Sequence, residues 1–276
     1  MGKELKAENL TISVPNVGCD KNCPYCVSKM TGYIKSDIVK MNMNIKKVIN
    51  ISQIAEVTSV LFTGKGEPTL NFEAIEQLSF NFKNLFPLEL QTNGVFLSKN
   101  LNKVDSLLIQ GFDIIAISID TELQLENYQK LFKKIIDLNM ICRLTINITN
   151  KLDKEFTFEK TIKYCTENGI QQLTLRRVAI PQKPLDKKVV GWIKENAPLD
   201  LYENVMRDVF LIIKEKGNLI RILNQGTKIY DIDGVSFTYS DYCLQEKDNG
   251  NNIRSLVFQE DGHLYTSWAS KASILF

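Results

Sequence analysis

Short apolar stretches of strand type alternate with segments of helical spacing along the first 180 residues of the chain. The predicted strands cover residues 10–15, 57–63, 88–92, 112–119, 141–149 and 172–180. The predicted helices between them cover residues 45–55, 71–84, 98–110, 122–138 and 158–167. Because parallel strands need long crossover connections, this order predicts an α/β fold with six β/α units. Periodicity alone does not choose between a barrel-like and a doubly wound parallel sheet.

The pattern changes after residue 181. Residues 182–200 contain prolines and lysines and are predicted to be irregular, whereas residues 201–216 have the spacing of an amphipathic helix that ends at Gly217. Two hairpins are predicted next, around Asp233-Gly234 and around Asp261-Gly262. We therefore divide the chain into a β/α core, 1–181, and a C-terminal helix with a small antiparallel β cap, 182–276, which is expected to close the substrate site.

Composition and charge narrow the class of protein. Hydrophobic residues make up 44% and charged residues 24%, as in folded globular proteins. The net charge of +2 gives no whole-molecule basic field that would hold nucleic acid. The longest apolar run, residues 112–119, is far too short to span a membrane, and residues 1–6 lack the apolar core of a signal peptide. The sequence therefore predicts a cytoplasmic protein with no membrane partner.

Three of the six cysteines are clustered. Cys19, Cys23 and Cys26 follow the first predicted strand, at the sheet edge where parallel α/β folds bind ligands. Thiolates suit zinc and iron–sulfur clusters. A structural zinc site needs a fourth ligand, and the only histidine, His263, is distant in the sequence. Three thiols would instead leave one iron of a four-iron cluster open to another ligand.

The CxxxCxxC spacing, with Tyr25 before the third cysteine, resembles the signature loop of the radical S-adenosylmethionine (SAM) superfamily. Residues 64–68, Gly-Lys-Gly-Glu-Pro, resemble the Gly-Gly-Glu-Pro motif of that family, with lysine in place of the first glycine. Residues 91–94 and 117–120 are similar to motifs that end the third and fourth strands. The resemblance covers residues 11–181 and implies a partial (β/α)6, TIM-like barrel.

The resemblance also implies a cofactor set and a chemistry. Cys19, Cys23 and Cys26 would hold one [4Fe–4S] cluster, and the amino and carboxylate groups of SAM would chelate its open iron. An electron from an external donor such as flavodoxin or ferredoxin would then cleave SAM to methionine and a 5′-deoxyadenosyl radical. That radical would abstract hydrogen from a substrate, while the protein orients the reactants and excludes solvent.

The cofactor-binding residues expected from these motifs lie at strand ends; they are Gly64, Gly66, Glu67, Asn93, Ser118, Asp120 and Arg177. Glu67 would pair with the SAM amino group, and Asn93, Ser118 and Asp120 would hold its ribose or carboxylate. Each of these four residues could instead form a turn or cap a helix. Of Arg176 and Arg177 only one can face the barrel interior, and we favour Arg177.

The remaining cysteines are predicted to be structural thiols, so that the protein holds a single cluster; they are Cys142, Cys165 and Cys243. His263 lies beside a predicted turn and is expected to be a surface residue. No catalytic side chain is assigned.

The leading functional hypothesis is a radical SAM enzyme acting on a small, anionic, nucleotide-like substrate. It depends on an interior arginine and on a cap suited to sealing a small molecule from water. One alternative is a glycyl-radical-enzyme activase or a peptide- or protein-modifying radical SAM enzyme. An alternative of another class is a non-catalytic, metal-binding redox sensor.

Overall fold

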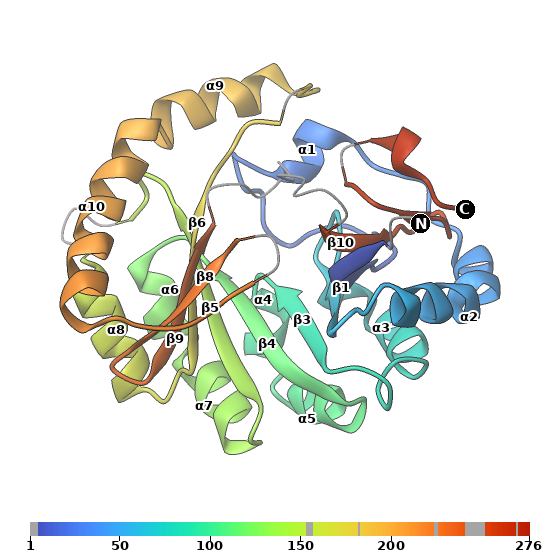
Figure 1. The fold of residues 1–276 in the computed structure, drawn as a ribbon, viewed down its shortest axis with the longest axis horizontal. Coiled ribbons are helices and arrows are strands. Elements are labelled where there is room, and N and C mark those ends of the chain that lie inside the picture. The colour runs from blue at the N-terminus through green and yellow to red at the C-terminus, as the bar shows by residue number, and fades with distance from the viewer. Residues whose placement is uncertain (1–4, 153–156, 182, 224–225, 241–251, 269) are drawn as a thin grey trace.

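In the computed structural model of the protein, residues 5–152, 157–181, 183–223, 226–240, 252–268 and 270–276 are described. The first part of the chain forms six parallel strands, namely β1 (Lys6–Ser13), β2 (Ser59–Thr63), β3 (Leu88–Thr92), β4 (Phe112–Ile119), β5 (Ile141–Ile148) and β6 (Gln172–Arg177). Each overlaps a predicted strand, although β1 begins at Lys6, four residues before the start predicted for it. The result is an open, TIM-like barrel wall with its helices outside (Figure 1).

The helices between these strands cover the outer face of the sheet, except α1, which lies in the loop after the cysteines (Figure 1). They are α1 (Val27–Thr31), α2 (Ile38–Ile54), the 3-10 turn η1 (Pro68–Asn71), α3 (Phe72–Ser79), α4 (Val95–Lys99), α5 (Asn102–Ile109), α6 (Glu122–Asn127), α7 (Gln129–Asp137) and α8 (Phe158–Glu167). The predicted helix at residues 122–138 is two helices, which meet at Tyr128. Thr121 and Gln124 form a capping box at the start of α6, which fixes this helix directly after β4.

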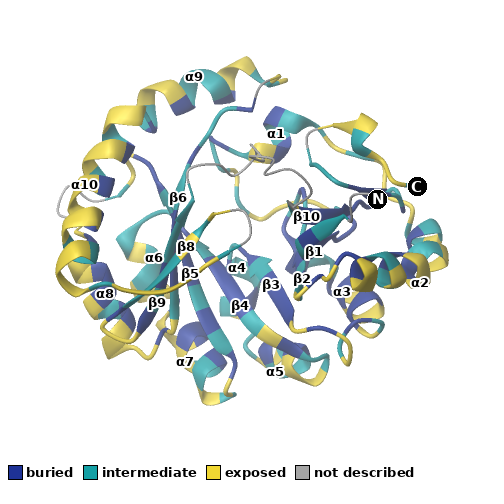
Figure 2. Ribbon diagram, viewed as in Figure 1, coloured by how far each residue is buried: buried dark blue, intermediate teal, exposed yellow. Residues whose placement is uncertain are grey.

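Outward and inward faces of the strands differ in chemistry. On β5, Cys142 and Leu144 belong to the main apolar core beneath the helices, whereas Arg143 and Thr145 line the barrel interior. The buried positions follow the strands in Figure 2. Closed TIM barrels fill their interior with branched apolar side chains. The polar interior observed here leaves room for a ligand.

The segment after residue 181 differs from the sequence prediction. Residues 182–200 were expected to be irregular, but α9 (Lys187–Asn196) lies there, followed by α10 (Leu199–Lys216). Asp186 caps α9 by accepting hydrogen bonds from the backbone N–H groups of Lys188 (2.8 Å) and Val189 (3.2 Å). The Asp186 cap and the burial of Val189 and Ile193 stabilise this helix by more than Gly191, in its middle, destabilises it.

Both predicted hairpins are present, and they extend the barrel sheet at its two edges. The C-terminal strands are β7 (Asn218–Ile222), β8 (Lys228–Ile232), β9 (Val235–Ser240), β10 (Asn252–Phe258) and β11 (Leu264–Tyr265), followed by the 3-10 turn η2 (Lys271–Ser273). The strand order is β11-β10-β1-β2-β3-β4-β5-β6-β9-β8-β7. The β10 strand runs parallel to β1, and β9 runs parallel to β6.

The Asp-Gly turns predict the two hairpins, but they do not predict which barrel strand each hairpin pairs with. In β10, Leu256, Val257 and Phe258 are all fully buried, as expected for a strand covered on both faces. The antiparallel pairs therefore continue the parallel wall, and the boundary at residue 181 stays a prediction. Within the described residues, no helix is both long and apolar enough to cross a membrane.

Candidate functional site

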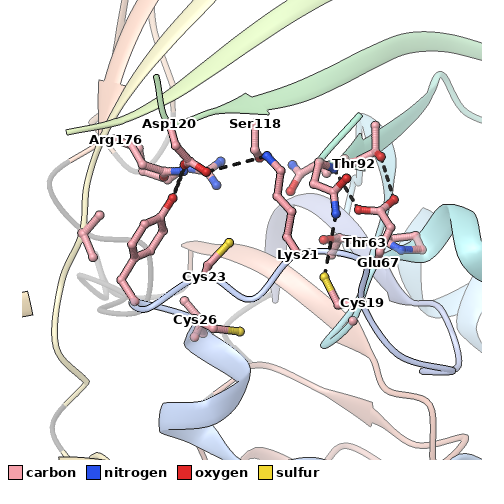
Figure 3. Close-up of a pocket in the computed structure, with 18 of the residues that line it drawn as sticks. Cys19, Lys21, Cys23, Cys26, Thr63, Glu67, Thr92, Ser118, Asp120 and Arg176 are labelled. Atoms are coloured by element: carbon pink, nitrogen blue, oxygen red, sulfur yellow. Dashed lines mark hydrogen bonds and ion pairs between the residues drawn. The ribbon is translucent and has the colours of Figure 1, made fainter. Parts of the chain in front are cut away.

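A pocket of about 230 Å³ opens where the cysteine loop crosses the carboxyl ends of the strands. We call it the upper pocket. Its lining comes from the cysteine loop and from strands β2 to β6, and includes Cys19, Lys21, Cys23, Tyr25, Cys26, Gly66, Glu67, Gln91, Thr92, Asn93, Ser118, Asp120, Asn147, Arg176 and Arg177. The structure thus brings every predicted site residue except Gly64 to one place, and Figure 3 shows many of their side chains.

The three loop cysteines are free thiols. Their sulfur atoms are spread along the loop in Figure 3. Burial, together with the charge of Asp120 and against the opposing effect of Lys21, raises the pKa of Cys23 to about 11. Within the described residues, no three His, Cys, Asp or Glu side chains are arranged to hold a single metal ion. A four-iron cluster places each thiolate on a different iron. The spread thiols therefore fit a cluster better than a mononuclear zinc site.

Glu67 lies in the wall of the upper pocket and is 4% exposed. Its Oε1 accepts hydrogen bonds from Thr69 N (3.1 Å), Thr69 Oγ1 (2.6 Å) and Thr92 Oγ1 (2.6 Å), and its Oε2 accepts one from Asn93 N (2.8 Å). Burial raises the pKa of Glu67, while these hydrogen bonds act in the opposite direction. Glu67 also caps η1, as the alternative assignment expected. With one donor on Oε2, this oxygen keeps capacity for a ligand ammonium group.

The glycines of residues 64–68 allow β2 to approach the start of the cysteine loop. A Cβ atom at Gly66 would overlap Asn16 Oδ1 and the carbonyl oxygen of Gly18, and a Cβ at Gly64 would lie 3.1 Å from the carbonyl oxygen of Val14. The backbone N–H of Glu67 donates to Gly18 O at 2.9 Å. Gly64 and Gly66 therefore act by letting the two backbones meet just before Cys19.

Lys65 occupies the position at which the sequence departs from Gly-Gly. Its Nζ donates to Gly32 O at 2.5 Å and to Thr31 Oγ1 at 3.4 Å, at the end of α1. A cation is favourable at a helix C-terminus. Lys65 thus links β2 to the short helix that follows the last loop cysteine.

Asp120, at the end of β4, holds the cysteine loop. It accepts hydrogen bonds from the hydroxyl of Tyr25 and from Asn147 Nδ2 (3.2 Å), and its Oδ2 lies 3.7 Å from Lys21 Nζ. Burial raises the pKa of Tyr25, and the charge of Asp120 adds to this shift. Lys21 and Asn147 were not predicted as site residues. The order of strands β4 and β5 could have suggested Asn147, since it lies near the end of the next strand.

Asn93 contacts the loop from β3. Its Nδ2 donates to Asp20 Oδ1 at 2.7 Å and lies 3.8 Å from Cys19 Sγ, while its Oδ1 accepts from Val95 N at 2.9 Å. Ser118 lines the same pocket from β4. Their binding of SAM, like that of Glu67 and Asp120, stays a prediction.

The arginine pair on β6 differs from our expectation. Arg176 shares the interior face with Gln172 and Thr174, whereas the Arg177 guanidinium lies over the Tyr202 ring of α10, 5.8 Å from its centroid. Alternation correctly predicted that one residue faces inward, but the choice of Arg177 was wrong, because Leu173 and Leu175 fix its face toward the helices. Arg177 still borders the upper pocket, so its contact with a cofactor stays a prediction.

A second, larger cavity of about 490 Å³ lies inside the barrel, and we call it the interior cavity. Gln91 and Arg176 line both cavities. At the interior cavity, Arg143 Nη1 lies 2.6 Å from Glu89 Oε2, and Arg143 Nε donates to Gln172 Oε1 at 2.7 Å. Sequence analysis included Gln91 in a motif without giving it a role, and it missed Glu89 and Gln172. Polar residues at alternate positions of predicted buried strands were a usable signal for them.

The remaining titratable candidates lie away from the upper pocket. Cys142 and Cys165 are fully buried in the core, where burial raises the pKa of Cys165 to about 12. Cys243 lies outside the described residues. His263 is half-buried at its turn, with Nε2 2.5 Å from Lys40 Nζ of α2. The prediction that the protein holds one cluster stays a prediction.

Comparisons with known proteins agree with this geometry. GTP 3′,8-cyclase from Clostridium acetobutylicum is 28% identical over 143 residues, which are 50% of this chain and 44% of that protein. A Methanocaldococcus jannaschii protein, assigned by its name to the glycyl-radical enzyme activating enzymes, is 26% identical over 74% of this chain and 75% of its own length. The chain therefore spans less than half of the cyclase.

Two further comparisons concern fold and family. The crystal structure of Streptococcus suis SuiB bound to S-adenosylmethionine superposes with a TM-score of 0.59 at 15% identity, covering 95% of this chain and 60% of that one. This likeness supports the barrel fold. The profile of the radical SAM superfamily matches residues 13–187, more than half of the chain. Together with the cysteine loop at the open end of a partial barrel, this match establishes that the chain belongs to the radical SAM superfamily.

Proposed function

We propose that this enzyme generates a substrate radical on a small, anionic, nucleotide-like molecule. Radical SAM enzymes use a [4Fe–4S] cluster and SAM. The observation that carries the proposal is the junction of the two cavities, where Gln91 and Arg176 line both the upper pocket and the polar interior cavity. A molecule in the interior cavity would therefore lie directly beneath a cofactor in the upper pocket.

In this proposal, different residues of the upper pocket bind the cluster and SAM. Cys19, Cys23 and Cys26 would hold the cluster, and Glu67 Oε2 would accept a hydrogen bond from the amino group of SAM. Asn93 and Ser118 would face its ribose or carboxylate. When bound, cluster and SAM supply a 5′-deoxyadenosyl radical that abstracts hydrogen. The protein's own contribution is to orient SAM, to hold the loop through Asp120 and to exclude water.

The chemistry of the interior cavity supports a polar substrate. Its walls carry amide, hydroxyl and charged side chains, such as Gln91, Thr145, Thr174 and the Glu89–Arg143 pair. Such groups suit a ligand with several hydrogen-bonding atoms. The similarity to a GTP cyclase supports a nucleotide-like ligand over other polar molecules.

We further propose that residues 182–276 close this site. Support comes from Trp192 of α9, whose ring lies 5.5 Å from the ring of Tyr25 in the cysteine loop. Ile229 of β8 and Arg221 of β7 line the interior cavity from the edge of the sheet. The C-terminal segment therefore lines the interior cavity and contacts the cysteine loop beside the upper pocket.

The test is an anaerobic assay on the reconstituted protein. After reduction with dithionite, we expect a four-iron EPR signal that changes when SAM is added. Release of 5′-deoxyadenosine should accelerate when a nucleotide substrate is present, so individual nucleotides and nucleosides are screened. SAM cleavage that none of them accelerates would contradict the nucleotide assignment. A signal indifferent to SAM, with no cleavage, would contradict the chemistry itself.

A second candidate is activation or modification of a protein or peptide. The similarity to the M. jannaschii protein favours it, because that alignment covers about three quarters of both chains. It predicts a stable partner complex in a pull-down and SAM cleavage that accelerates only with that partner. Membership of an enzyme superfamily sets aside the non-catalytic redox sensor.

A further inference from the structure

One cation of the cysteine loop points into the upper pocket without a hydrogen-bond acceptor. Lys21 lies between Cys19 and Cys23, and its Nζ is buried with no hydrogen-bond partner among the described residues. Its ion pair with Asp120 Oδ2, at 3.7 Å, is longer than a hydrogen bond. Figure 3 shows this side chain crossing the pocket toward the end of β4. A buried ammonium group is costly unless an acceptor completes its shell.

A second cation faces the same space from β6. Arg176 lines both the upper pocket and the interior cavity. In the part of the chain that the structure describes, neither a hydrogen bond nor an ion pair is found for its guanidinium. No carboxylate among the described residues pairs with it: Glu67 keeps its charge but bonds to four neutral donors, and Glu89 is paired with Arg143.

The third carboxylate near these cations is Asp120, and both of its oxygens already have partners. Tyr25 and Asn147 donate to one of its oxygens, and Lys21 approaches the other. The lining of the upper pocket therefore holds three cations, Lys21, Arg176 and Arg177, against two carboxylates, Glu67 and Asp120. Positive charge is in excess there, and Arg176 carries it to the junction with the interior cavity.

We propose that Lys21 and Arg176 together bind a phosphate group of the substrate at this junction. This assignment deepens the proposed function and rests on it. A guanidinium offers a planar fork of donors and an ammonium a mobile point charge, so the pair can contact different oxygens of one phosphate. A phosphate monoester carries close to two negative charges at neutral pH, which matches two cations. The rest of the substrate then extends into the interior cavity, past Gln91 and Thr174.

Four other arginines line the cavities, and two of them, Arg221 and Arg254, border only the interior cavity and not the upper pocket. The other two have partners of their own. Arg143 is bonded to Glu89 and Gln172, and Arg177 lies over the ring of Tyr202. The phosphate is therefore assigned to Lys21 and Arg176.

The experiment is a titration of the reconstituted, SAM-loaded protein with inorganic phosphate, followed by 31P NMR line broadening. We expect saturable binding by the wild type, and binding weaker by about tenfold or more in both Lys21→Gln and Arg176→Gln, because each loses a charge-assisted hydrogen bond. Lys163→Gln removes one charge from an exposed ion pair on α8 and should bind phosphate as the wild type does. Iron content checks that each variant still holds its cluster.

Three outcomes would overturn the assignment. The first is no saturable phosphate binding by the wild type, and the second is binding within twofold of wild type in Arg176→Gln. The third is loss of bound phosphate when SAM is added to SAM-free protein, which would assign the cations to the carboxylate of SAM. Failure of the proposed function is seen separately, as the absence of nucleotide-accelerated 5′-deoxyadenosine release from wild-type protein.

Discussion

The upper pocket and the interior cavity meet at Gln91 and Arg176, but their polar groups are bonded differently. In the upper pocket, Glu67 and Asp120 have their oxygens engaged by side chains and backbone of neighbouring strands and of the loop. In the interior cavity, Glu89 and Arg143 are bonded as well, to each other and to Gln91 and Gln172. The hydroxyls of Thr145 and Thr174, by contrast, have no hydrogen bond within the described residues.

This difference suits two separate tasks: binding a cofactor that is always the same, and recognising a particular substrate. A pocket whose side chains are held by the protein itself is pre-organised, so binding a fixed cofactor there costs little rearrangement. A cavity with open hydroxyls leaves its hydrogen bonds for a ligand. Under the proposed function, the bonded carboxylates Glu67 and Asp120 would serve the cofactor, and the open hydroxyls of Thr145 and Thr174 would serve substrate specificity.

The largest expected effect concerns the cysteines that we propose as cluster ligands in the upper pocket. Cys23→Ser should abolish both iron binding and SAM cleavage, because three thiolates are needed to leave a single open iron. Cys142→Ala is the matched control, since this thiol is fully buried in the core. It should lower the free energy of unfolding by about 1 kcal/mol or more and keep the iron. Iron content and chemical denaturation measure the two effects, and equal iron loss in both variants would contradict the assignment.

A smaller effect is expected at Gly66, where the segment after β2 contacts the start of the cysteine loop. Gly66→Ala places a Cβ against Asn16 Oδ1 and Gly18 O, so the base of the loop has to move. We expect a stability loss of about 1–3 kcal/mol and reduced cluster occupancy. In Gly191→Ala, on α9, the new Cβ meets no atom within 4 Å and should stabilise the protein by about 0.5–1 kcal/mol. Unchanged iron content in Gly66→Ala would show that the contact is not needed.

Much of this comparison was accessible from the sequence. Strand positions and the cysteine loop were predicted, because apolar periodicity and thiol spacing are local properties. The partners of β9 and β10 were not, since pairing across the sheet edge is a non-local property. Arg177 was chosen over Arg176 because the face of a strand depends on its register, and a shift of one residue exchanges the two faces.

A matched pair of threonines tests the comparison directly. Thr92 Oγ1 donates to Glu67 Oε1 at 2.6 Å and accepts from Gly94 N at 3.0 Å, so Thr92→Val should cost about 1–3 kcal/mol. Thr174→Val removes a hydroxyl that faces the interior cavity and should change the free energy of unfolding by less than about 0.5 kcal/mol. Urea denaturation of both variants decides the point. Equal losses would remove the distinction between the two regions.

The smallest expected effect concerns the lysine that replaces a family glycine. Lys65→Met leaves Gly32 O without its 2.5 Å donor and should lower the free energy of unfolding by about 1 kcal/mol at neutral pH. Lys35→Met, at an exposed position, should change it by less than about 0.5 kcal/mol.

The pH dependence of this difference identifies its cause. Burial lowers the pKa of Lys65 below its usual 10.5, so the folded protein holds this proton less tightly than the unfolded chain does. The stability difference between wild type and Lys65→Met should therefore grow as pH rises from the lowered pKa toward 10.5, and shrink as pH falls. Denaturation curves of the two proteins across this range measure it. A constant difference would mean that Lys65 acts through packing at the end of α1 and not as a buried cation.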